Sequence, residues 1–213
     1  MRALTEKQYR RREKILAAAR DLITQHGYEG VTMRDLAAKA GVTPKTLYHQ
    51  FGNKEKLLRT AVEERFRHTY QAIDDHQMKS GVDKLYFIID SVADSARKNI
   101  AYARALTPLL ASRASDPFVR IRLNTYRNAL RQIRDEGEFL DWVDVAVMTH
   151  VIYRNVHPLY PTWYGDTAGV LPEDFGKYNV SLTLAASTTG YTNQQAVRMI
   201  NSLQDKLSQI DQY

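Results

Sequence analysis

The stretch from Thr32 to Leu58, TMRDLAAKAGVTPKTLYHQFGNKEKLL, constrains the fold more than any other part of the chain. It contains two short apolar-patterned segments that are separated by Gly41, and each begins with a threonine, a residue type that caps helices. A helix of about eight residues is unstable alone in water, so it forms only when its apolar face packs against other helices. The sequence therefore predicts two short helices within a rigid trihelical frame.

Local signals place the ends of these helices. Thr32 caps the first helix, and Gly41 supplies the left-handed residue that ends it. Thr43 and Pro44 form an N-cap and N1 pair for the second helix, because proline lacks only an N–H that the first turn would leave unbonded. A third, long helix is predicted over residues 53–77. This order of elements is typical of a helix-turn-helix module.

The second helix has an apolar side and a polar side. Leu47 and Phe51 are expected to pack against the frame, which leaves the opposite face in solvent. That face can enter a DNA major groove about 12 Å wide, where its side chains meet phosphates, base edges and thymine methyl groups. The alternative is a helix pair that only completes a bundle. The outward residues are Thr43, Lys45, Thr46, Tyr48 and His49.

Charge is distributed unevenly along the chain. Residues 1–60 contain 13 Lys and Arg against 6 Asp and Glu, whereas residues 61–213 contain 17 against 18, within a net charge of +6 for the whole chain. This asymmetry indicates a module that meets a polyanion, joined to one that does not. Basic residues near the N-terminus add DNA contacts or form a solvated arm. They are Arg2, Arg10, Arg11 and Arg12.

Hydrophobic periodicity predicts that almost the whole chain is helical. Residues 15–23 follow the spacing of one helix face, which a Thr5–Gln8 capping box begins and Gly27 ends. No long stretch alternates with a period of two, so strands are not expected. The fold class is therefore all-α. Further helices are predicted at residues 82–99, 117–134, 142–156, 172–189 and 193–210.

Several classes of protein do not fit the composition. No apolar run approaches the length of a membrane span, and the basic N-terminus lacks the apolar stretch of a signal peptide. The chain has no cysteine, which suits a reducing cytoplasm. Residues 141–157 contain carboxylates and histidines but no HExxH or paired ExxH motif, and no Gly-rich phosphate loop or GxSxG elbow occurs. We expect no enzyme, no cofactor and no metal.

The run T-x-R-D-L-A-x-K-A-G-V-x-x-x-T-L-Y-x-x-F-x-N-K-E-x-L-L, with the preceding helix and its HGYEG end, resembles the DNA-binding domain of the TetR family of bacterial transcriptional regulators. The resemblance covers about residues 8–60 and extends loosely to the WY…G…LPEDF segment. It implies a helix-turn-helix DNA-binding domain at residues 1–52 and a helical effector-binding and dimerisation domain at residues 53–213.

The resemblance also implies roles for residues of the first domain. Thr32 and Arg34 lie where the family's supporting helix holds phosphate, and Tyr48 and Lys54 match its phosphate-binding tyrosine and lysine. Pro44 departs from the pattern, because it has no amide N–H for a backbone contact with DNA. Recognition-helix positions that contact bases or phosphates are occupied by Thr43, Lys45, Thr46 and His49.

The neutral remainder of the chain is rich in aromatic residues, with ten of the thirteen tyrosines and both tryptophans. Aromatic side chains in a helical lobe commonly build only the core. The resemblance nevertheless implies a cavity for a small effector, and an aromatic wall suits an apolar or aromatic ligand. By helical position, the predicted wall residues are Phe66, Tyr70, Phe87, Tyr102, Leu106, Tyr126, Met148 and Ile152.

Two late helices, at about residues 141–157 and 172–189, resemble the pair that dimerises in the family as a four-helix bundle. The alternative is burial within one chain. Residues 193–210 either cap the seam or cover the core. Together these features predict a dimeric, ligand-responsive repressor of a pseudopalindromic operator in double-stranded DNA; the alternative is a constitutive DNA-binding protein. The two predicted seam stripes are Val145, Thr149, Ile152 and Val156, and Leu182, Ala185, Ala186 and Thr189.

Overall fold

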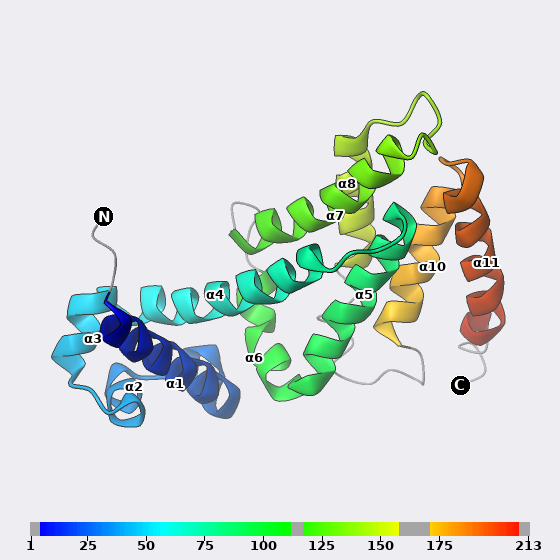
Figure 1. Ribbon diagram of the computed structural model, residues 1–213. Coiled ribbons are helices and arrows are strands. Elements are labelled where there is room, and N and C mark those ends of the chain that lie inside the picture. Colours follow the sequence, from blue (N-terminus) through cyan, green and yellow to red (C-terminus); the bar gives the residue numbers. More distant parts are fainter. Residues whose placement is uncertain (1–4, 112–116, 158–170, 209–213) are drawn as a thin grey trace. The chain divides into compact units, whose positions relative to one another are not determined.

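The structure is a computed structural model of the 213-residue chain, and it describes residues 5–111, 117–157 and 171–208. Over these residues the fold is all-α, as predicted (Figure 1). Phe139 and Thr188 form an isolated antiparallel bridge. The helices are α1 (Glu6–Gly30), α2 (Met33–Ala40), α3 (Pro44–Phe51), α4 (Lys54–Asp75), α5 (Gly81–Lys98), α6 (Ile100–Ala111), α7 (Pro117–Asp135), α8 (Val145–Val156), α10 (Pro172–Ala185) and α11 (Gly190–Leu207).

The helices form two compact units. One consists of residues 1–68 and 99–113, and the other of residues 69–98 and 114–213. This division falls inside α4 and places α6 with the N-terminal helices, because α6 packs against α1. The predicted domains, residues 1–52 and 53–213, divide the chain by expected function and not by packing. They remain a prediction.

In the first unit, α1 packs against α2 and α6. Its N-terminus has the predicted capping box, in which the Thr5 side chain and the Gln8 side chain each bond the other residue's backbone N–H. The helical conformation is interrupted at Gly27, whose φ is 73°. The apolar face predicted for residues 15–23 is buried, which anchors α1 to its neighbours; it consists of Ile15, Leu16, Ala19, Leu22 and Ile23.

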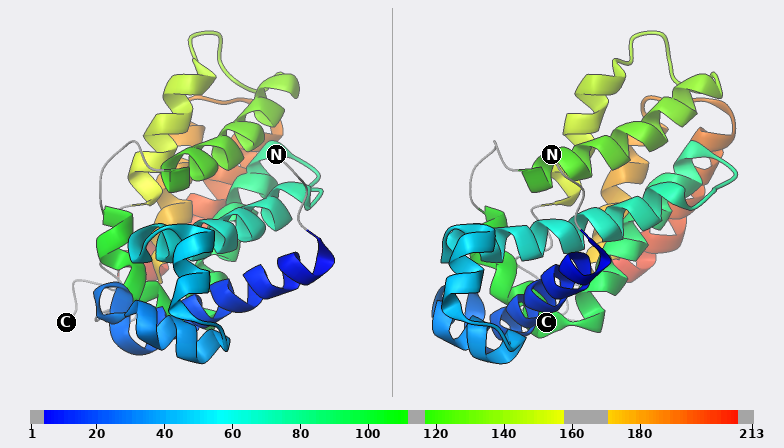
Figure 2. Two further views of the ribbon diagram at one scale, coloured as in Figure 1. Left: turned by 90° about the vertical axis from the view of Figure 1, so that its left-hand side faces the viewer. Right: turned by 60° about the vertical axis from the view of Figure 1, so that its left-hand side comes forward.

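In the second unit, α7 packs against α5 and α8, and α10 packs against α5, α8 and α11. Figure 2 shows α10 and α11 lying side by side. The first residue of α5 comes so close to α7 that a Cβ on Gly81 would lie 2.5 Å from Ile133 Cγ1 and 2.6 Å from the Ala129 carbonyl oxygen. The core consists of Val82, Leu85, Ile88, Ile89, Phe118, Leu130, Ile133, Ile152, Val156, Val180 and Leu184.

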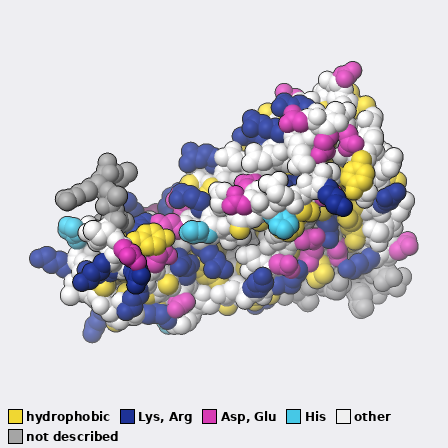
Figure 3. Space-filling model, viewed as in Figure 1, with side chains coloured by type: hydrophobic (Ala, Val, Ile, Leu, Met, Phe, Trp, Pro, Cys, Tyr) yellow, Lys and Arg dark blue, Asp and Glu magenta, His cyan; other side chains and the backbone are white. Residues whose placement is uncertain are grey.

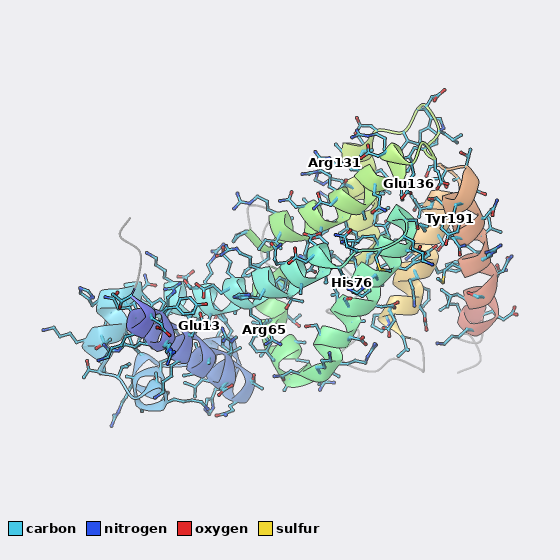
Figure 4. The ribbon with its side chains drawn as sticks, viewed as in Figure 1. Glu13, Arg65, His76, Arg131, Glu136 and Tyr191 are labelled. Atoms are coloured by element: carbon cyan, nitrogen blue, oxygen red, sulfur yellow. The ribbon has the colours of Figure 1, made fainter. Side chains whose placement is uncertain are left out.

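The start of α11 is fixed by a loop residue. The carboxylate of Glu138 accepts hydrogen bonds from the backbone N–H groups of Tyr191 and Thr192, both at 2.8 Å. Tyr191 is labelled in Figure 4. Burial raises the pKa of Glu138, but hydrogen bonds from Thr192 and Tyr191 outweigh burial and leave its pKa below the ordinary value. An anion at a helix N-terminus is also favoured by the helix dipole. The helix therefore begins at Gly190, three residues before the predicted start.

The α8 stripe predicted for a dimer seam is wrong, because it packs inside its own chain. Val145 is 7% exposed, and Thr149, Ile152 and Val156 are fully buried. The opposite face of the helix carries Val147, which is 62% exposed, and Val151, which is 39% exposed. Because α8 has apolar residues on both faces, periodicity alone does not distinguish them. The α10 stripe stays accessible in part, since Leu182, Ala186 and Thr189 are exposed and Ala185 is half-buried.

Over the described residues, no helix combines the length and the apolar character needed to cross a membrane.

Candidate DNA-binding interface

The helix-turn-helix has the predicted geometry. The Thr32 side chain accepts the Asp35 N–H at the start of α2, and Gly41 ends that helix in the left-handed conformation, with φ 66° and ψ 41°. The Gly41 N–H then bonds carbonyls of the last turn, which leaves the chain free to reverse direction. The Thr43 side chain accepts the Thr46 N–H at the start of α3. Capping therefore defines both helices and the turn between them.

Burial orients α3. Leu47 and Phe51 are almost completely buried, as predicted, whereas Tyr48 on the other side of the helix is 52% exposed. With no intrinsic stability of its own, this two-turn helix depends on those two apolar contacts. Its outward face is consequently held in one orientation, which a surface that reads DNA requires.

Most of the predicted DNA-binding side chains are exposed. On α2, Thr32 and Arg34 are exposed, although the Thr32 hydroxyl also donates to the Asp35 carboxylate at 2.6 Å. On α3, the hydroxyls of Thr43 and Thr46 lie 3.0 Å apart, so they can act together as donor and acceptor. Figure 3 shows Lys and Arg side chains on these N-terminal helices. The exposed members on α3 and its cap are Thr43, Lys45, Tyr48 and His49, and Thr46 is half-buried.

Lys54 lies at the first position of α4 and is half-buried. Its ammonium group donates to the Glu29 carbonyl, near the end of α1, at 3.2 Å. An ammonium group has three donors, so this bond leaves donors for a phosphate. Lys54 therefore combines a structural contact between α1 and α4 with the position predicted to hold DNA.

The N-terminal arginines differ from one another. Arg2 lies outside the described residues, Arg11 is exposed, and Arg10 pairs with Glu6 on the exposed first turns of α1. Arg12 pairs with Glu64 of α4 instead, and its guanidinium lies over the Phe51 ring. Arg12 therefore interacts within the protein and is not part of a solvated arm.

The predicted effector-binding residues fall in both units. Phe66, Tyr102 and Leu106 belong to the first unit, and burial raises the pKa of Tyr102 to about 12. In the second unit, the half-buried Phe87 stacks on His76, with 4.4 Å between ring centroids. A single cavity lined by all eight residues stays a prediction. The remaining members, Tyr70, Tyr126, Met148 and Ile152, are buried in the second unit.

Sequence reasoning missed a buried polar cluster in the second unit. Arg122 of α7 is 6% exposed, donates to the Phe118 carbonyl at 3.2 Å, and lies 3.3 Å from His157 Nδ1. The His157 ring packs against Tyr153 and Tyr126, with centroids at 4.6 and 5.8 Å. Burial, and then the charge of Arg122, hold the pKa of His157 well below its ordinary value.

A signal for this cluster was present in the sequence. Phe118, Arg122 and Tyr126 follow one another at intervals of four, so an arginine occupies the apolar stripe of α7. Tyr153 and His157, which are also four residues apart, make a ring contact across one turn. Among the described residues, no group of three or more His, Asp or Glu is placed to hold a metal ion.

Comparisons with known proteins extend these findings. A family model described as bacterial regulatory proteins, tetR family, matches residues 15–61. The HTH-type transcriptional repressor AcnR of Corynebacterium efficiens is 42% identical over 55 residues, which are 26% of this chain and 29% of that protein. The HTH-type transcriptional regulator UidR of Escherichia coli K12 is 20% identical over 181 residues, with 78% of this chain and 84% of UidR covered.

The fold is shared more widely than the sequence. The structure of SmeT, the repressor of the Stenotrophomonas maltophilia multidrug efflux pump SmeDEF, matches with a TM-score of 0.67 over 85% of this chain and 92% of SmeT, at 22% identity. This likeness extends the match beyond the helix-turn-helix to the helices that follow it. The TetR family consists of regulators and not of enzymes. Residues 15–61 therefore form a DNA-binding domain of the TetR family of transcriptional regulators, on a helical fold that the chain shares with solved regulators.

Proposed function

We propose that the protein is a homodimeric repressor that binds a pseudopalindromic operator and releases it when a small apolar or aromatic molecule binds in the C-terminal helices. The observation that carries this proposal is the exposed polar face of α3, held in place by buried Leu47 and Phe51. A two-turn helix reads few base pairs, so a two-fold pair of such helices is needed for a selective site. A protein with this role acts in the cytoplasm, where bacterial DNA lies.

Helix α4 supports a ligand response, because it is one continuous helix of 22 residues that starts next to the helix-turn-helix. Its other end is fixed in the second unit. The ammonium group of Lys84 donates to the carbonyls of Asp74 and His76 at 2.7 and 2.9 Å, and the Thr125 hydroxyl donates to the Asp74 carboxylate at 2.9 Å. A ligand that tilts α4 changes DNA affinity only through its own preference for one state, and a tenfold change needs about 1.4 kcal/mol.

Ligand complexes of proteins with this fold support the effector class. SmeT has been solved as a complex with triclosan, and the regulator FadR from Bacillus subtilis as a complex with stearoyl-CoA. Both ligands have large apolar portions. In this chain the second unit has a buried tyrosine, Tyr126, and a buried arginine, Arg122, about one turn apart on α7. An apolar or aromatic effector fits that composition.

The dimer is proposed to form through the faces of α8 and α10 that one chain leaves in solvent. Val147 and Val151 of α8 and Leu182 of α10, which is 46% exposed, are apolar side chains on these two neighbouring helices. Burial of such side chains against a second copy stabilises a complex by about 25 cal/mol per Å² of apolar surface. Ala186 adds a small residue that permits close approach of helices.

Two measurements test the proposal. Selection of bound duplexes from a random pool by the full chain is expected to yield a pseudopalindrome whose affinity falls steeply with salt. A panel of apolar and aromatic compounds is then expected to contain one that raises the melting temperature, since a ligand at a hundredfold excess over its Kd stabilises by about 2.7 kcal/mol. That compound must also weaken operator binding. If no compound changes DNA binding, the constitutive alternative is favoured. If the chain selects no duplex from the pool, the proposed repressor function is refuted.

A further inference from the structure

The side chain of Arg12 connects three helices of the first unit. From α1, Arg12 Nη2 donates to Glu64 Oε1 on α4, and its Cζ lies 5.2 Å from the centroid of the Phe51 ring on α3. The Arg12 and Glu64 side chains are only 24% and 22% exposed, so solvent screens the ion pair less than it screens a pair on the open surface.

The place of Phe51 makes this contact relevant to DNA. Phe51 is the last residue of α3, and its buried ring fixes the end of the recognition helix. Glu64 lies ten residues into α4, or about 15 Å along that helix. A guanidinium can satisfy both neighbours at once, because its edge donates to a carboxylate while its face covers an aromatic ring. The position of α3 is thereby tied to α4 by the side chain of Arg12.

The sign of the charges separates this role from a DNA contact. An arginine that binds phosphate gains nothing from an acidic neighbour, so neutralising Glu64 would strengthen DNA binding by removing a negative charge near the polyanion. An arginine that positions α3 needs Glu64, and neutralising the carboxylate weakens DNA binding. Glu64→Gln therefore distinguishes the two roles by the direction of its effect.

We propose that Arg12 is a positioning residue for the recognition helix, which it holds between α1 and α4 through the Glu64 carboxylate and the Phe51 ring. The inference rests on the proposed function, because it concerns the DNA affinity of α3. It assigns a conformational role to one member of the basic N-terminal group, and it leaves the exposed Arg11 as the matched residue for comparison.

The test uses the full chain and the operator duplex obtained by selection. Arg12→Met and Glu64→Gln are each expected to lower operator affinity about fivefold, and the double variant is expected to lose no more than either single variant, since both remove one interaction. The slope of log affinity against log salt is expected to stay at its wild-type value. Arg12→Lys, which keeps the charge but not the planar face, is expected to fall between wild type and Arg12→Met.

Controls distinguish variants that lose their fold from variants in which only the position of α3 changes. Circular dichroism and melting temperature are measured for every variant, and binding is measured well below the lowest melting temperature. Arg11→Met is expected to reduce the salt slope by about one unit if Arg11 meets a phosphate. The inference is overturned if Glu64→Gln binds DNA as well as or better than wild type, or if Arg12→Met reduces the salt slope. Failure of the wild-type chain to select DNA refutes the proposed function instead.

Discussion

At the scale of single residues, His157 differs from the other histidines of the chain. It is buried between α7 and α8, whereas His26, His49, His68, His76 and His150 are exposed. Its neighbours are the Arg122 guanidinium and the rings of Tyr126 and Tyr153. Burial, and then the charge of Arg122, make a proton on His157 unfavourable in the folded protein.

His157 is therefore expected to make stability depend on pH. Its folded-state pKa lies well below 6.5, so the native imidazole is neutral and the unfolded state binds the proton first. The free energy of unfolding is not reduced by His157 above about pH 6.5. Below that pH it falls by up to about 1.4 kcal/mol per pH unit, because the unfolded state binds the proton more readily. Urea unfolding of wild type and His157→Gln at pH 7.5 and 5.5 checks this. The stability gap between the two proteins should narrow at pH 5.5, and an unchanged gap would contradict the expectation.

A second residue-scale prediction separates phosphate contacts from base contacts. Lys54→Ala is expected to weaken binding to all duplexes alike and to lower the salt slope by about one unit, because a phosphate contact carries no sequence information. Lys45→Ala and Thr46→Ala are expected to change sequence preference as well, at a cost of about 1–3 kcal/mol on the selected operator. Repeated selection with each variant measures both effects. Wild-type binding by a Tyr48→Ala, Lys54→Ala double variant would exclude this surface.

At the scale of helices, the close approach of α5 to α7 depends on one missing side chain. Gly81→Ala is expected to destabilise the fold by about 1–3 kcal/mol, because its Cβ would overlap the backbone of α7. Gly176→Ala is the matched variant: its Cβ would meet Ile89 Cγ2 at 3.2 Å, a side-chain atom, and alanine favours the helix by about 0.5–1 kcal/mol. The melting temperatures of the two variants are compared by thermal unfolding. Equal melting temperatures for the two variants would show that α5 can move away from α7.

Much of the helical pattern could be predicted, since caps and apolar spacing are local properties. Thr5, Thr32, Gly41 and Thr43 mark helix ends in the sequence, and each performs that role in the structure. Helix α6 was not predicted, because its sequence IAYARALTPLLA is apolar on most sides and contains a proline, so no single face stands out.

The candidate site could be predicted only in part, for a related reason. The exposure of the residues predicted to bind DNA follows from the periodicity of α3, which buries Leu47 and Phe51 and leaves the opposite face in solvent. The partners of Arg12 do not follow from periodicity, because Glu64 is 52 residues away and the pair depends on how three helices pack. Likewise, the apolar residues on both faces of α8 do not reveal which face the chain buries.

At the scale of the whole molecule, the proposed dimer leads to the most specific prediction. Val147→Glu combined with Leu182→Glu places charges on the exposed faces of α8 and α10 and is expected to give folded monomers, because a desolvated unpaired carboxylate opposes association. Val197→Glu is the control, since Val197 is an apolar residue 42% exposed on α11. Sedimentation at micromolar concentration gives the mass, and circular dichroism verifies folding. A folded double variant that stays dimeric would place the interface elsewhere.

The anchored end of α4 has a geometric consequence for DNA spacing. Lys84 donates to the carbonyls of Asp74, near the end of α4, and of His76, just after it. Helix α4 has 22 residues and is about 33 Å long. In the proposed dimer, a turn of about 5° about that end would carry the other end of α4 through about 3 Å, and the same turn in the two-fold partner would double the change to about 6 Å. Base pairs follow one another every 3.4 Å or so along B-DNA. In the proposed repressor, a tilt of a few degrees at Lys84 would therefore change the separation of the two recognition helices by nearly two base-pair steps.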